Sequence, residues 1–295
     1  MVDFTLFLIA VYCFIEDWMK AQQLRLRRRG PQPKLSDAEV LTMEIVGEFL
    51  GLDTDKAIYP FFRRYWTDWF PALRRVHRTT FVRQAANLTG VKAALWKALL
   101  RAIPYDPYLS IVDSFPVPVC RLARAYRCRR FAGEAAYGYD EMNKQVFYGF
   151  RAHLRICWPG VIVAADLAPA NVHELTMLEE IAANAQGWLL GDRNFWSPQK
   201  QAALKARGLH LCAPYKSARR DPTPWPRWLV QVRRRIETVI AQLVERFHAK
   251  RVWARDRWHL SCRWWRKILA HTFAVWFCYH IGLDSPLQFD KAFAL

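Results

Sequence analysis

Residues 1–103 carry apolar residues at the spacing of amphipathic helices. Ser36 followed by Glu39 is the signature of a capping box at the start of one such helix, and Gly51 is a stop signal at its end. Residues 4–15 are apolar but too few to cross a bilayer, so they predict a buried helix. This part of the chain is therefore expected to be all helical.

From residue 104 the pattern changes to short apolar runs that predict strands. These runs cover residues 108–112, 146–157, 161–167, 188–190 and 209–213. The first three can form a meander, whereas the last two alternate with helices, which implies parallel pairing through right-handed crossovers. Residues 104–295 therefore predict a three-layer α/β domain with a mixed sheet.

Helical patterns separate and follow these strands. One helix is expected to open at Asn171 or His173, and another is capped by Ser197. The C-terminal part of the chain adds a stiff proline connector and two long helices, given by Pro222, Pro224, Pro226, residues 228–250 and residues 260–281.

The chain is strongly basic, with 44 Lys and Arg against 26 Asp and Glu and a net charge of +18. Such an excess on a folded protein indicates a polyanionic partner, with nucleic acid first and a membrane surface second. The seven cysteines form no CxxC motif, so a zinc ribbon or a thioredoxin motif is not supported. Nothing suggests secretion, and we expect a cytoplasmic protein that associates with the nucleoid.

Basic residues gather in two places outside the predicted strands. One group precedes and opens the helical pattern at residues 79–88, and helix, turn and basic helix is the arrangement of a major-groove reader. The second group lies between the first two predicted strands, where it would hold a DNA backbone. A solvated basic face is the alternative for both groups. The candidate DNA-binding residues are Arg74, Arg75, Arg78, Arg121, Arg124, Arg127, Arg129 and Arg130.

Two acidic residues follow predicted strands directly. Asp113 ends the strand at residues 108–112, and Asp192 comes after the strand at residues 188–190. If these strands are parallel neighbours, both carboxylates emerge at the same edge, where open α/β sheets place their ligands. Carboxylates this close repel each other and need a cation, for which Mg²⁺ or Mn²⁺ is the best candidate. The alternative is that each Asp only caps a turn or a helix.

A third acid, Glu237, lies at the border of the apolar stripe of the helix predicted at residues 228–250. A carboxylate at this border can reach over the sheet edge while the stripe packs down. Arg233 and Arg234 come just before it and suit phosphate contacts. Glu237 could also be an ordinary ion-pair partner of Arg233 at helical spacing.

Several blocks in this order resemble the catalytic domain of bacterial insertion-sequence transposases of the DDE (Asp-Asp-Glu) superfamily. The resemblance spans about residues 105–280. Arg233 matches an Arg that related groups place before the Glu, whereas Val230 and Val244 replace the usual Tyr and Lys. The blocks are IVDSFPVP at 111–118, GEAAYGY at 133–139, YGFRAH at 148–153, APANVHE at 168–174, GDRNF at 191–195 and RIETVIAQL at 235–243.

The resemblance implies an RNase H-like catalytic domain at residues 104–295, with C-terminal helices. Its triad would be Asp113, Asp192 and Glu237, which would hold two divalent ions. Residues 1–103 are then expected to bind DNA ends.

The implied reaction is cleavage of insertion-sequence ends and transfer of the 3′-OH ends to target DNA by two-metal-ion phosphoryl transfer. His153, in the third block, would lie near the ions or be a core histidine. Terminal inverted repeats and target DNA are the expected partners, bound by a homodimer or a higher oligomer. The alternatives are an RNase H-like nuclease without strand transfer, and a non-catalytic or domesticated DNA-binding protein.

Overall fold

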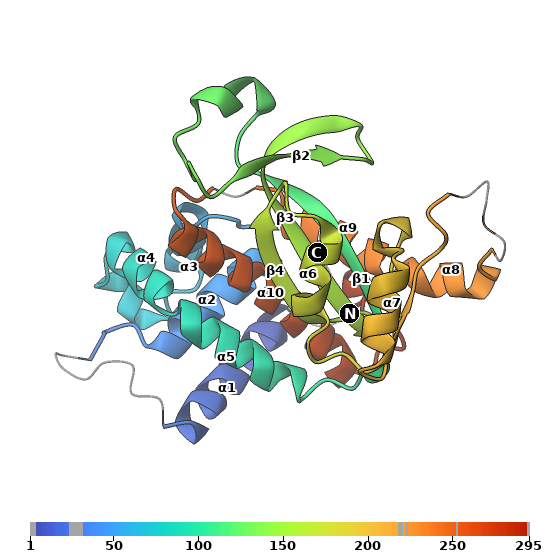
Figure 1. Cartoon of the computed structure of the whole chain (residues 1–295). Coiled ribbons are helices and arrows are strands. Elements are labelled where there is room, and N and C mark those ends of the chain that lie inside the picture. The colour runs from blue at the N-terminus through green and yellow to red at the C-terminus, as the bar shows by residue number, and fades with distance from the viewer. Residues whose placement is uncertain (1–3, 24–31, 218–220, 222–223, 252, 294–295) are drawn as a thin grey trace. The chain divides into compact units, whose positions relative to one another are not determined.

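A computed structural model (Figure 1) describes residues 4–23, 32–217, 221, 224–251 and 253–293. The chain divides into two compact units. The first contains Met1–Ile103, Glu245–Ala249 and Trp253–Leu295, and the second contains Pro104–Val244 and Lys250–Val252. Pro222 of the predicted connector lies outside the described residues.

The first unit is built from helices. Its α2 begins with a capping box, in which the Glu39 amide donates to Ser36 Oγ (3.1 Å) and the Ser36 amide donates to Glu39 Oε2 (2.6 Å). Gly51 follows α2 with a φ of +79°, so both predicted signals for this helix are confirmed. The main helices are α1 (Phe4–Ala21), α2 (Asp37–Phe49), α3 (Asp55–Tyr65), α4 (Arg78–Asn87), α5 (Thr89–Leu100) and α10 (Arg257–His280), with short η1 (Pro71–Arg74) and α11 (Phe289–Ala292).

Helix α10 crosses the core of the first unit and carries buried charges. Arg266 is fully buried and donates to Glu48 Oε2 (2.6 Å) and to Asp55 Oδ1 (2.6 Å). Lys92 forms a buried ion pair with Glu44 (2.7 Å). Buried charges persist only when they are paired, so these contacts tie α10 to α2 and α3, and α5 to α2. The sequence places the C-terminal helices with the second domain, whereas these contacts group α10 with the N-terminal helices.

The second unit contains a six-stranded mixed sheet, in agreement with the predicted α/β class. Strand β3 pairs antiparallel with β1 and with β4, and β1 and β6 pair parallel with β5 on either side of it. Strand β2 pairs with the first residues of β3 and is not predicted by the sequence pattern. The strands are β1 (Asp106–Pro118), β2 (Ala136–Asp140), β3 (Gln145–Trp158), β4 (Val161–Pro169), β5 (Gly187–Leu190) and β6 (Leu209–Cys212).

Helices α6 (Glu174–Ile181) and α7 (Pro198–Lys205) follow β4 and β5 and pack on the sheet. His173 caps α6 and Ser197 caps α7, as the sequence predicts. Their apolar faces bury the core that holds the sheet edge in place. This core is formed by Val112, Leu178, Ile181, Ala182, Leu189, Phe195, Leu204, Leu209 and Leu211.

The prediction of one continuous helix at residues 228–250 is wrong. The structure has two helices, α8 (Arg227–Arg233) and α9 (Arg235–Glu245), separated at Arg234. At the break the Glu237 amide donates to the Arg234 carbonyl (3.0 Å), which tightens the turn. The arginines on either side have different partners, since Arg235 lies over the Trp158 ring at 5.1 Å and Arg233 reaches Glu237.

No helix within the described ranges has the length and apolar character needed to cross a bilayer.

Candidate active site

The two aspartates emerge where the parallel pairing of β1 and β5 ends. The last paired residues are Ile111 and Leu190, and Asp113 and Asp192 each lie two residues further along their chains. The sequence places Asp113 at the end of its strand, but this is wrong, because β1 continues to Pro118. The continuation is antiparallel pairing with β3 alone.

Local backbone contacts fix both carboxylates. The Ser114 amide donates to Asp113 Oδ1 (2.7 Å), and the Asn194 amide donates to Asp192 Oδ1 (2.9 Å). Asp192 thereby caps the short helix η3 (Arg193–Phe195). The turn needs Gly191, because a Cβ there would lie 2.8 Å from Cβ of Phe195.

The environment disfavours the charged form of both aspartates. Burial, and secondly the charge of Asp192, raise the pKa of Asp113 to about 7. Burial, and secondly the charge of Glu174, raise the pKa of Asp192 to about 6. Partly buried carboxylates that repel each other in this way gain stability from a bound cation or a bound proton.

Arg233 lies between Glu237 and Asp113 and contacts both carboxylates. The Arg233 guanidinium donates to Glu237 Oε1 (2.7 Å) and lies 4.0 Å from Asp113 Oδ2. Arg233 is about one-fifth exposed and Glu237 about half exposed, so Glu237 faces solvent beside the guanidinium. The Arg233–Glu237 ion pair, which the sequence predicts as the alternative role of Glu237, is therefore present. Within the described residues, no three His, Cys, Asp or Glu side chains form a group that could hold a metal ion.

A fourth carboxylate, Glu174, adjoins the aspartates. It begins α6, accepts hydrogen bonds from the Ser114 hydroxyl and pairs with Arg151 (3.2 Å). Its charge acts on both Asp113 and Asp192. It also lines a polar cavity of about 280 Å³ together with Arg151, Asn194 and Glu141.

Residues 107–254 match a family model described as the Transposase DDE domain. The chain belongs to the DDE transposase family. The match covers half of the chain and includes Asp113, Asp192 and Glu237.

A solved structure has a similar fold. It is the cryo-EM structure of piggyBac transposase in a synaptic complex with hairpin DNA, which is 11% identical and has a TM-score of 0.50. The similarity covers 99% of this chain and 79% of that chain. No curated protein sequence matches the transposase.

His153 of the transposase is buried on β3. It pairs with Ser114 in the β1–β3 ladder, so its side chain lies on the opposite face of the sheet from Asp113. Burial lowers its pKa to about 4, and its Nε2 has no hydrogen-bond partner among the described residues. The accessory role remains a prediction.

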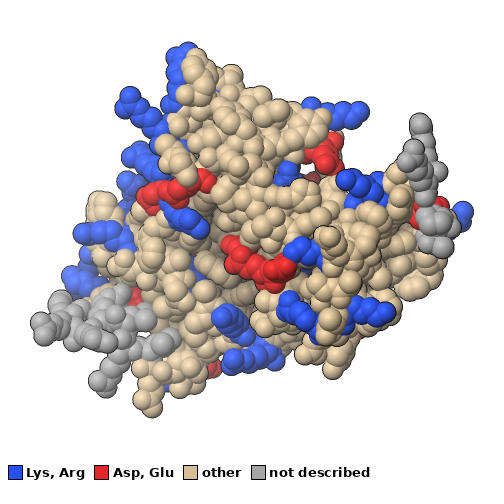
Figure 2. All heavy atoms as spheres, in the orientation of Figure 1, with Lys and Arg blue, Asp and Glu red and all other residues tan. Residues whose placement is uncertain are grey.

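The arginines predicted between the first strands lie around η2 (Leu122–Arg127) of the transposase. All are exposed, and none forms an ion pair within the described part of the chain. Lys and Arg side chains are visible at the top of Figure 2, where the segment between β1 and β2 lies. Arg127 stacks on the Tyr126 ring at 4.8 Å. These residues are Arg121, Arg124, Arg127, Arg129 and Arg130.

The remaining predicted DNA contacts are dispersed. Arg234 is exposed at the α8–α9 break. In the first unit, Arg74 pairs with Asp68 (3.1 Å), Arg75 is exposed and Arg78 is half-buried at the start of α4.

Sequence reasoning missed Glu174 as a site residue. Its signal was its position at the end of the APANVHE block, directly before an expected helix.

Proposed function

We propose that the chain is a DNA transposase that cleaves the ends of its element and joins the freed 3′ ends to target DNA. Asp113, Asp192 and Glu237 are its proposed metal ligands. The observation that supports this most strongly is the partly buried Asp113–Asp192 pair at the point where the parallel pairing of β1 and β5 ends. The alternatives are a nuclease that does not join DNA and a DNA-binding protein that does not cut it.

The sheet topology supports an RNase H-like catalytic domain. The strands follow the order β4–β3–β1–β5–β6, in which β3 alone runs antiparallel to the others. The carboxylates lie where the parallel pairing of β1 with β5 ends, as expected for a site at the carboxyl edge of an α/β sheet.

The chemistry of the donors fits divalent metal ions. Carboxylate oxygens are the preferred ligands of Mg²⁺, and Asp113 and Asp192 are desolvated and repel each other. Asp113, Asp192 and Glu237 would hold the ions. When bound, two such ions stabilise the attacking and leaving oxygens of a phosphoryl transfer.

The surrounding residues have separate roles in this proposal. Arg233, once released from Glu237, is placed to contact a phosphate. The pair between Arg151 and Glu174 (3.2 Å) holds Glu174 beside the aspartates. The exposed arginines around η2 bind the DNA backbone without reading its sequence.

A strand-transfer assay tests the proposal. The protein is incubated with Mg²⁺, labelled element ends and a supercoiled plasmid, and joined products are expected. Products that are only cut indicate the nuclease alternative. Binding without cutting indicates the non-catalytic alternative.

Arg233→Gln is expected to tighten Mn²⁺ binding about tenfold, because two unit charges 4 Å apart interact by about 1–4 kcal/mol in a partly screened site. The substitution removes a cation that lies beside Asp113 and occupies Glu237. Titration calorimetry well above pH 7, where Asp113 is ionised, measures the change.

Arg234→Gln is the matched control. It removes the same charge from the adjacent residue, which is exposed. Equal Mn²⁺ affinities of the Arg233 and Arg234 variants would show that Arg233 does not compete with the metal.

A further inference from the structure

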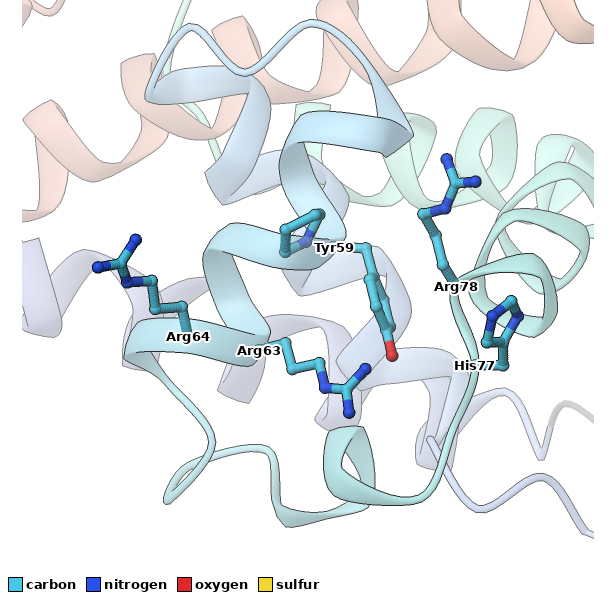
Figure 3. Close-up of a pocket in the computed structure, with 6 residues that line it drawn as sticks. Tyr59, Arg63, Arg64, His77 and Arg78 are labelled. Carbon is cyan, nitrogen blue, oxygen red and sulfur yellow. The ribbon is translucent and has the colours of Figure 1, made fainter.

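A basic cavity lies in the first unit, between α3 and the start of α4. Its volume is about 400 Å³. Figure 3 shows the Tyr59 ring between Arg63 on one side and His77 on the other, while the side chains of Arg64 and Arg78 point away from this group. The lining contains three arginines and no acidic residue: Tyr59, Pro60, Arg63, Arg64, His77 and Arg78.

The frame of this cavity is fixed by internal contacts. The Tyr59 hydroxyl donates to the Val76 carbonyl (2.5 Å), and its ring packs against the Phe81 ring with centroids 5.9 Å apart. These two contacts join α3 to the chain on both sides of His77. Tyr59 is buried, so the hydroxyl bond is not exposed to competing water.

His77 is oriented by the start of α4. His77 Nδ1 lies 3.3 Å from the Thr79 amide nitrogen and 2.9 Å from Thr79 Oγ1. When Nδ1 accepts from the amide, the ring hydrogen is on Nε2. No described residue bonds Nε2. His77 is exposed, and it therefore presents an N–H donor at the cavity.

Two of the cavity arginines have side-chain N–H donors that no other side chain or backbone group accepts from within the described residues. Arg63 and Arg78 form no ion pair and no side-chain hydrogen bond with any residue that the structure describes. Other arginines of this unit are engaged, such as Arg74 with Asp68 and Arg266 with Glu48. Two free guanidinium groups on neighbouring elements leave a local excess of positive charge, which attracts an anion.

We propose that this cavity binds a backbone phosphate of the DNA on which the transposase acts. Arg63 donates to the phosphate oxygens from α3, His77 Nε2 adds a second donor, and Arg78 reaches the same phosphate from α4 by turning its guanidinium toward the cavity. Guanidinium groups match phosphate geometry with paired N–H donors. The inference rests on the proposed function, and it assigns Arg78 to positioning DNA on its backbone instead of reading its bases.

The test compares Arg63→Gln and Arg78→Gln by fluorescence anisotropy on labelled duplexes, one an element end and one a scrambled sequence. Each variant is expected to bind both duplexes about tenfold more weakly. Each lost phosphate contact should lower the slope of log affinity against log salt by about 0.9. Arg63→Lys and Arg78→Lys keep the charge and should retain most of the slope.

Arg83→Gln is the matched control, because Arg83 is exposed on α4 but does not line the cavity. A salt slope that is unchanged in the cavity variants, or lowered equally in the Arg83 variant, overturns the inference. Thermal unfolding must show that the cavity variants fold like the wild type. Arg63 and Arg78 lie on different helices, so either glutamine variant provides the test where the other does not fold.

These outcomes are distinct from failure of the proposed function. A wild-type protein that binds no DNA contradicts the proposed function itself. A wild-type protein whose DNA cleavage depends on Asp113, together with cavity variants of unchanged salt slope, contradicts only the phosphate cavity.

Discussion

Asp113→Asn is expected to lower the rate of DNA-end cleavage at least about 100-fold, because even residues that only support metal ligands cost 10–100-fold when replaced. Asparagine has nearly the same shape, but it carries no negative charge and binds a divalent ion weakly. Binding of the labelled end should remain close to wild type, because the arginines that hold the backbone are unchanged. Single-turnover cleavage with Mg²⁺ and anisotropy binding measure the two quantities separately.

Asp106→Asn is the control for this prediction. Asp106 begins the same strand, is exposed, and accepts a hydrogen bond from the Tyr108 amide (2.8 Å). The control should cleave at the wild-type rate. If Asp113→Asn also cleaved at that rate, Asp113 could not be a ligand of the reactive metal, and the proposed site would be wrong.

The position of Asp113 beside Asp192 could be predicted from the sequence. Two short apolar runs, each followed by an aspartate, predict carboxylates at one edge if the strands are parallel neighbours, and β1 and β5 are. The length of β1 was not accessible, because its last residues are held by antiparallel pairing with β3. That pairing joins segments that are far apart along the chain, and nothing local to Asp113 indicates it.

Two other differences between the predicted and the observed elements also involve contacts that the local sequence pattern does not show. Strand β2 is short, contains Gly138 and pairs only with the first residues of β3, so its own sequence carries little strand signal. The break between α8 and α9 contains neither proline nor glycine. It accompanies separate contacts of Arg233 with Glu237 and of Arg235 with Trp158.

The buried charge of Arg266 shows most clearly what the sequence pattern does not predict. The sequence predicts a packed helix around Arg266, but a charged residue inside it has no assigned partner. Its partners Glu48 and Asp55 lie on α2 and α3, more than 200 positions away. Local pattern thus predicts which faces are buried, whereas the pairing of charges depends on the tertiary fold.

The same long-range packing gives the metal-free protein a dependence on pH. Burial and Asp192 raise the pKa of Asp113 from 3.8 to about 7. Between these values the native protein holds a proton that the unfolded chain has released. The free energy of unfolding due to Asp113 is therefore greatest below pH 4 and decreases as the pH rises to about 7.

The expected loss is on the order of 4 kcal/mol, from about three pH units at 1.36 kcal/mol each. The comparison of wild type with Asp113→Asn isolates the contribution of this site, because carboxylates away from it titrate equally in both proteins. Urea unfolding at a series of pH values should show the variant gaining stability over the wild type between pH 4 and 7. Parallel stability curves for the two proteins would show that Asp113 titrates normally.

A divalent ion should reverse this loss. Above pH 7 the aspartates are ionised and Arg233 offsets their repulsion only in part, so Mn²⁺ that binds only the folded protein raises its stability by RT ln(1 + [Mn²⁺]/Kd). At 100 times Kd the gain is about 2.7 kcal/mol. Asp113→Asn should gain little at the same concentration. Equal gains in both proteins would place the bound ion away from Asp113, because an ion held by this pair loses a charged ligand when asparagine replaces it.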